Sequence, residues 1–157
     1  MPEKKVIGLN PLRFLIGKWE GHGEGFGQKS EVEHSYQFVL QDQFIQSQTT
    51  SIVRGEDGTT EEIHEDLGIF SFDSARKKII FRAFYSEGYI NEYVMEEGTQ
   101  AENQIILTTE KAENAGGMMA RLRTEIISEN EYVMTLDLAN KGGEFKPCQV
   151  IRMRKVS

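Results

Sequence analysis

The densest chemical pattern in the chain is a run of alternating glycines in residues 17–27, GKWEGHGEGFG. A run of the form G-x-G-x-x-G can cradle the phosphates of a dinucleotide, provided that a strand precedes it and a helix follows. The third glycine of that form would stand at position 26, where the sequence has Phe26. Residues 30–40 alternate as a strand does, so no helix follows. We therefore reject dinucleotide binding.

The same run is more informative as a β-strand, in which alternate residues share a face. Trp19, Gly21, Gly23 and Gly25 then lie on one face, which carries almost no side chains after the indole. We expect this face to point inward, because Trp19 is large and apolar. Two explanations stay open. The glycines allow the strand to bend sharply, or they allow bending and also leave room for a ligand.

Histidine and cysteine side chains are too few and too scattered for a metal site. His22, His34 and His64 show no H-x-H or H-x-x-x-H spacing, and Cys148 is the single cysteine. His34 is expected on an apolar strand face, either as a hydrogen-bonded core residue or as a polar contact to a ligand. No nucleophile elbow marks a catalytic serine, so we expect no enzyme.

Composition limits the classes of partner. The chain has 157 residues with 25 acidic and 18 basic side chains, a net charge of −7. An acidic surface repels phosphate backbones and anionic lipids, so we expect neither nucleic acid nor a membrane as partner. No apolar run is long enough to span a bilayer, and the N-terminus lacks the pattern of a signal peptide. We therefore expect a cytoplasmic protein.

The elements that must position these residues are almost all strands. We expect one domain over residues 1–157, with a flexible N-terminus at 1–9, a helix at 10–17 that covers one mouth, and a barrel at 18–156. The expected strands are 19–27, 30–41, 43–54, 60–71, 77–85, 88–96, 103–110, 119–128, 131–139 and 145–155. Short connections make neighbours antiparallel, and closing the sheet removes its edges. The sequence therefore predicts an all-β, ten-stranded antiparallel up-and-down β-barrel with one short N-terminal helix.

Residues 12–25, LRFLIGKWEGHGEG, resemble the opening of the nitrobindin-type haem-binding β-barrel family, whose signature is a short helix followed by G-x-W-x-G-x-G-x-G. Residues 132–139 and 144–154 are similar to the last two strands of that family and of lipocalin-like (calycin) relatives of unknown function. The resemblance implies a barrel like that of fatty-acid-binding proteins, with a lumen open at one end.

The resemblance also implies a haem-iron ligand, a His directly after the Pro that opens the last strand. Pro147 matches that Pro, but the next residue here is Cys148. A thiolate can ligate haem iron, whereas a free cysteine is more often a small buried hydrophobe. We expect no cofactor and no metal, with haem at Cys148 as the alternative.

Inward arginines could pair with a ligand carboxylate in a forked geometry. The candidates are Arg82, Arg121, Arg123 and Arg152. Arg152 is preferred because strict alternation puts it on the same strand face as Cys148.

We expect a small-molecule-binding protein that takes an apolar or amphipathic ligand into the barrel lumen. The expected ligand-binding residues are Trp19, Gly21, Gly23, Gly25, His34, Tyr36, Phe38, Phe81, Cys148 and Arg152. Two alternatives stay open. One is a haem protein that handles nitrogen oxides or peroxides, as the resemblance implies, and the other is a filled barrel that acts in assembly, for which a homodimer is left open.

Overall fold

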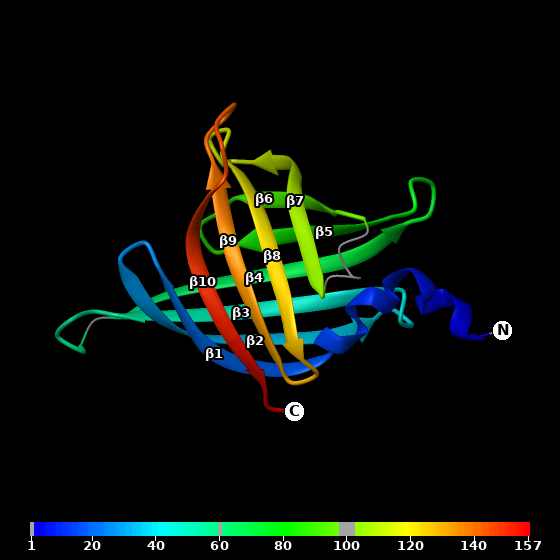
Figure 1. Cartoon of the computed structure of the whole chain (residues 1–157), viewed down its shortest axis with the longest axis horizontal. Coiled ribbons are helices and arrows are strands. Elements are labelled where there is room, and N and C mark those ends of the chain that lie inside the picture. Colours follow the sequence, from blue (N-terminus) through cyan, green and yellow to red (C-terminus); the bar gives the residue numbers. More distant parts are fainter. Residues whose placement is uncertain (1, 60, 98–102) are drawn as a thin grey trace.

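The computed structural model describes residues 2–59, 61–97 and 103–157, and in it the chain forms a closed antiparallel barrel (Figure 1). Each strand pairs with the next along the chain, and β1 pairs with β10 to close the cylinder. The strands are β1 (Gly17–Gly25), β2 (Gln28–Val39), β3 (Phe44–Arg54), β4 (Glu61–Asp73), β5 (Lys78–Tyr85), β6 (Ile90–Met95), β7 (Gln104–Glu113), β8 (Met119–Ser128), β9 (Glu131–Ala139) and β10 (Lys146–Lys155). The predicted all-β barrel of ten strands is confirmed.

The N-terminal helix differs from the prediction in type and in length. It is a 3-10 helix, η1 (Pro2–Leu15), which begins at Pro2 instead of Asn10. Leu9, Leu12 and Leu15 are all buried. A spacing of three matches the three residues per turn of a 3-10 helix, so these leucines form one apolar stripe. The flexibility expected of residues 1–9 stays a prediction.

The helix lies at one end of the barrel, away from the β1–β2 turn (Figure 1). The indole Nε1 of Trp19 donates a hydrogen bond of 2.8 Å to the carbonyl oxygen of Leu15, which fixes the end of η1 to the start of β1. A Cβ atom at Gly8 would overlap the ring of Phe72, so the helix also packs closely against β4. None of the described helices is long and apolar enough to cross a membrane.

The glycines of β1 allow β10 to approach closely. A Cβ atom at Gly21 would overlap the carbonyl oxygen of Arg152, and one at Gly25 would overlap that of Cys148. At Gly23 the added atom would lie 2.7 Å from the hydroxyl of Ser30. The neighbouring strands therefore fill the space that the missing side chains leave. This favours the explanation that Gly21 and Gly23 allow β1 to bend over the explanation that they leave room for a ligand.

Candidate functional site

A cavity of about 620 Å³ occupies the barrel lumen. At one end it reaches Leu12 and Leu15 of η1, and at the other it reaches Phe26 and Met118 in the connecting loops. Phe26 is 62% exposed, so the cavity meets solvent at the end away from the helix. The volume is in the range of sites for drug-sized ligands.

The two sides of the lumen differ in polarity. The polar wall is formed by β2–β6 and the turn after β5, and it contributes Ser30, His34, Tyr36, Ser47, Thr49, Ser51, His64, Asp66, Tyr85, Glu87, Tyr89, Asn91 and Tyr93. The apolar wall is formed by β7–β10 and contributes Ile105, Leu107, Ala120, Leu122, Met134, Leu136, Leu138 and Ile151. Thr124 and Gln149 are its polar members. Such a lumen suits a molecule with one polar and one apolar part.

His34 is the centre of a buried hydrogen-bonded cluster in the polar wall. Its Nδ1 is hydrogen-bonded to the hydroxyl of Tyr132, and the hydroxyl of Tyr36 lies 3.3 Å from both groups. Burial lowers the pKa of His34 to about 4, so the ring is neutral near pH 7. The ring of Trp19 packs on Tyr132, with 4.6 Å between centroids. His34 is thus both a hydrogen-bonded core residue and a wall of the lumen.

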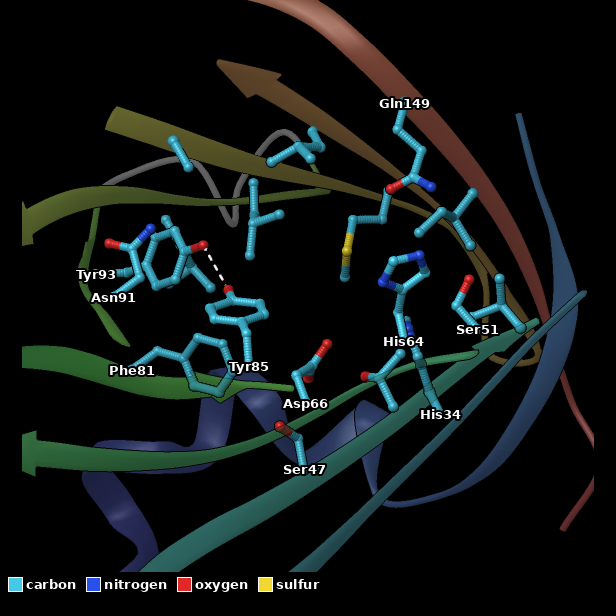
Figure 2. Close-up of a pocket in the computed structure, with 18 of the residues that line it drawn as sticks. His34, Ser47, Ser51, His64, Asp66, Phe81, Tyr85, Asn91, Tyr93 and Gln149 are labelled. Carbon is cyan, nitrogen blue, oxygen red and sulfur yellow. Dashed lines mark hydrogen bonds between the residues drawn. The ribbon is translucent and has the colours of Figure 1, made fainter. Parts of the chain in front are cut away.

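A second polar cluster surrounds Asp66 on β4. Asp66 lies opposite Thr49 in the β3–β4 ladder and opposite Tyr85 in the β4–β5 ladder. Figure 2 shows its carboxylate directed into the cavity near Tyr85. Burial raises the pKa of Asp66 to about 6, a hydrogen bond with Thr49 opposes that rise, and the charge of Glu87 adds to it.

Tyrosine rings line the lumen beside this carboxylate. The hydroxyls of Tyr85 and Tyr93 are hydrogen-bonded at 2.8 Å, as the dashed line in Figure 2 shows. The rings of Tyr85 and Tyr89 are stacked, with 4.4 Å between centroids. Phe81 stacks on Tyr93 with 5.7 Å between centroids. Together the four rings form an aromatic wall next to the carboxylate of Asp66.

Two lumen side chains have buried polar atoms without a partner among the described residues, Oδ1 of Asn91 and Oγ of Ser30. Asn91 is 4% exposed and Ser30 is 7% exposed. A buried polar atom without a hydrogen bond costs free energy. Both atoms are covered by neighbouring protein atoms, so they are a local cost of the fold and not contact points for a molecule in the cavity.

At the mouth, Nδ1 of His64 is hydrogen-bonded to a carboxylate oxygen of Glu87, and its Nε2 lies 3.7 Å from Glu62. This arrangement holds the ring at the rim of the polar wall. In the described part of the chain no group of three or more His, Cys, Asp or Glu residues could hold a metal ion.

The predicted site residues are only partly brought together. Gly25, His34, Tyr36 and Phe81 line the cavity. Trp19 is buried behind it, and Gly21 and Gly23 are covered by neighbouring strands. Phe38 is half-buried near the helix, where the guanidinium of Arg13 lies 5.3 Å from its ring centroid. These four residues support the wall and do not line it.

The inward face predicted for β10 is wrong. Cys148 is half-buried, and its thiol donates to the carbonyl oxygen of Lys146 at 3.3 Å. Arg152 is exposed, whereas Gln149 and Ile151 line the lumen. The reason is a register shift between Pro147 and Gln149, which inserts Cys148 as an extra residue and reverses the alternation after it.

The other candidate arginines also lie outside the lumen. Arg82 is exposed, and its Nε lies 2.9 Å from Glu92. Arg121 and Arg123 bind the fully buried carboxylate of Asp137 at 2.8 Å and 2.6 Å. None of the lumen-lining residues that the structure describes is Lys or Arg. None of the four candidate arginines is therefore inward, and the preference for Arg152 as a ligand contact is wrong.

Sequence reasoning missed Asp66, Tyr85, Tyr93, Asn91 and Gln149 as lumen residues. A usable signal existed for four of them. Asp66 alternates with Gly68 and Phe70 on one face of β4, and Tyr85 alternates with Phe81 on β5. Asn91 and Tyr93 alternate in the same way on β6. Gln149 carried no such signal, because the extra residue Cys148 reverses the alternation of side chains just before it.

A family model described as the THAP4-like, heme-binding beta-barrel domain matches residues 8–155 of the chain. No curated protein matches the sequence. Among solved structures, Rv2717c from M. tuberculosis aligns with a TM-score of 0.68 and 15% identity, over 96% of this chain and 98% of that one.

Two further structures have the same architecture. The S-type phycobiliprotein lyase CPES from Guillardia theta aligns with a TM-score of 0.59 and 9% identity, over 99% of this chain and 98% of that one. EF1p2_mFAP2b bound to DFHBI aligns with a TM-score of 0.50 and 10% identity, over 93% and 97%. At these identities the similarities establish the fold alone.

Proposed function

The chain belongs to the THAP4-like, heme-binding beta-barrel domain family. We propose that it binds an amphipathic small molecule in the barrel lumen. The observation that carries the proposal is the cavity of about 620 Å³ between a polar and an apolar wall. A side-chain-filled barrel would leave no such volume, which argues against a purely structural role. The structural neighbour that is bound to DFHBI gives secondary support for a small-molecule site in this fold.

The apolar wall supplies most of the binding free energy in this proposal. Burying roughly 300 Å² of apolar ligand surface at about 25 cal/mol per Å² gives about 7 kcal/mol before the costs of association. Those costs reduce the net affinity to the micromolar class at best. The polar wall then fixes the orientation of the ligand, because each buried polar atom needs a partner.

Haem is the group that the family description names, and the lumen residues do not fit it at the position that the resemblance assigns. Cys148 faces away from the cavity, and the inward residue beside it is Gln149, whose carboxamide is a poor iron ligand. The described lining also offers no Lys or Arg to pair with the carboxylates of haem. We therefore do not assign haem as the ligand.

Nile red, a neutral apolar dye, tests the proposed binding with two matched variants of β3. Ser51 points into the lumen, whereas Gln48 is exposed on the outer face of the same strand. Ser51→Phe should occupy lumen volume and reduce the dye affinity by roughly tenfold or more, while Gln48→Phe should leave it unchanged. Equal dye binding by the two variants would contradict a lumen site.

A haem titration separates the main alternative. The proposal predicts no Soret band when haem is added to the purified protein. A band that disappears in His34→Ala or His64→Ala and survives in Cys148→Ala would show that haem is the ligand after all, held by a lumen histidine.

A further inference from the structure

We propose that the lumen selects an amphipathic molecule with a positively charged amine head group, which Asp66 and the neighbouring tyrosines receive. This inference rests on the proposed function and adds the chemical class of the ligand. The carboxylate of Asp66 would pair with the ammonium group, and the apolar wall would hold the hydrocarbon part.

The charge in the lumen is carried by carboxylates, among them that of Asp66. Asp66 points into the cavity (Figure 2), and Glu65 and Glu87 also line it. Among the described residues no Lys or Arg side chain lines the cavity, and buried His34 is neutral near pH 7. The remaining basic side chain, His64, is hydrogen-bonded to Glu87, so none of the described Lys, Arg or His side chains forms an ion pair with Asp66. The carboxylates there disfavour an anionic ligand.

An aromatic wall lies beside Asp66 in the lumen. Tyr85, Tyr89 and Tyr93 line the lumen on the side of Asp66, and Phe81 continues the stack. A ring face attracts a cation, and proteins recognise ammonium groups with several aromatic rings arranged around them. The combination of a carboxylate and several rings distinguishes this site from a general apolar cavity.

Three probes with the same ten-carbon chain test the inference by isothermal titration calorimetry at neutral pH, namely decylamine, decan-1-ol and decanoate. Decylamine should bind roughly tenfold or more tightly than decanol, the size expected for a hydrogen bond to a charged group. Decanoate should bind most weakly of the three. Equal or tighter binding of decanol or decanoate would overturn the inference.

Two variants show whether Asp66 is responsible. Asp66→Asn should reduce the affinity for decylamine by roughly tenfold and leave that for decanol within about twofold. Glu33→Gln, which removes a carboxylate from the exposed outer face of β2, should change neither affinity. Equal losses of decylamine affinity in both variants would show that only the net charge matters, and would overturn the role of Asp66.

The failure of the inference can be distinguished from the failure of the proposed function. If decanol and Nile red bind but decylamine has no advantage, the lumen is a binding site without the proposed selectivity. If neither decanol nor Nile red binds, the proposed function is wrong, and the inference is wrong with it. Circular dichroism spectra of both variants establish that they retain the fold.

Discussion

Asp66 and Tyr85 lie directly opposite each other in the β4–β5 ladder, and both side chains line the lumen. The pair places an ionisable carboxyl group against a half-buried aromatic ring in the polar wall. Burial of this kind is unfavourable for a charged group.

Removing the charge of Asp66 should stabilise the protein near neutral pH. The pKa of Asp66 is raised from 3.8 to about 6, so folding favours the protonated form. The stability contributed by the neutral carboxyl is present below about pH 4 and is lost as the pH rises through about 6. Asp66→Asn should therefore gain about 1 kcal/mol at pH 7.5, after allowance for partial solvent exposure, and almost nothing at pH 4.

Urea denaturation of the wild type, Asp66→Asn and Glu33→Gln at both pH values measures this difference. The side chains around Asp66 are Thr49, Tyr36, Tyr85, Tyr89, Tyr93, Glu87 and His64. A gain that is the same at both pH values would contradict the raised pKa of Asp66.

Binding of decylamine should weaken as the pH falls through 6. Only the ionised carboxylate attracts the ammonium group, and burial gives Asp66 a pKa of about 6. The affinity for decanol should not change over the same range. Titrations at several pH values from about 5 to 7.5 provide the profile, and the Asp66→Asn variant should flatten it. A profile that persists in this variant would contradict the assignment of the pH dependence to Asp66.

His34 should make the protein less stable in acid. Its pKa is lowered by burial from 6.5 to about 4, so folding favours the neutral ring. The stability that depends on this neutral ring is present above about pH 6.5 and is lost as the pH falls through about 4. His34→Gln, which keeps polar atoms near Tyr132, should show a smaller loss of stability over that window. NMR titration of the ring should give the low pKa directly, and a value near 6.5 would contradict the burial argument.

Gly21→Ala should destabilise the closure between β1 and β10. The added Cβ atom would overlap the carbonyl oxygen of Arg152, which belongs to the backbone and cannot rotate away. We expect a loss of about 2 kcal/mol or more. Gly58→Ala is the matched control, because Gly58 has open space and a φ of +71°, so that only the left-handed backbone cost of about 1 kcal/mol applies. Thermal unfolding of both variants measures the difference, and equal losses would contradict the steric explanation.

Asp137→Ala should destabilise the outer wall, because it leaves Arg121 and Arg123 without their shared carboxylate. Asp137 is 0% exposed, although it lies on the outer face of β9. We expect a loss of about 1–3 kcal/mol, reduced from the cost for a fully buried pair because the arginines reach solvent. Glu92→Ala removes the exposed pair with Arg82 and should cost less than about 1 kcal/mol. Similar losses of stability in the two variants would show that the burial of Asp137 does not increase the contribution of its ion pairs to stability.

The strand pattern could be predicted because alternation and turn residues are local properties. The bounds of β8 and β9 agree with the prediction at both ends, and the other strands agree to within a few residues. The faces of β2 and β5 were also predicted, since His34, Tyr36 and Phe81 lie inside. The helix begins earlier than predicted, because the three-residue spacing of Leu9, Leu12 and Leu15 extends its apolar stripe toward the N-terminus.

The site itself was less predictable, because it depends on which strands face each other across a closed cylinder. The polarity of the walls emerges only when β2–β6 and β7–β10 are placed on opposite sides of the lumen. The pairing of Asp66 with Tyr85 depends on register, and the orientation of Cys148 depends on one bulge. None of these is encoded in a short motif.

The bulge at Cys148 reverses the direction of the side chains that follow it in β10. Counted from Lys146 with strict alternation, the inward series would contain Cys148 and Arg152, which would bring a thiol and a cation into the lumen. The extra residue replaces them with Gln149 and Ile151 without changing any amino acid. Barrels of this architecture can therefore exchange the chemistry of their last strand by gaining or losing one position, even when the surrounding sequence stays the same.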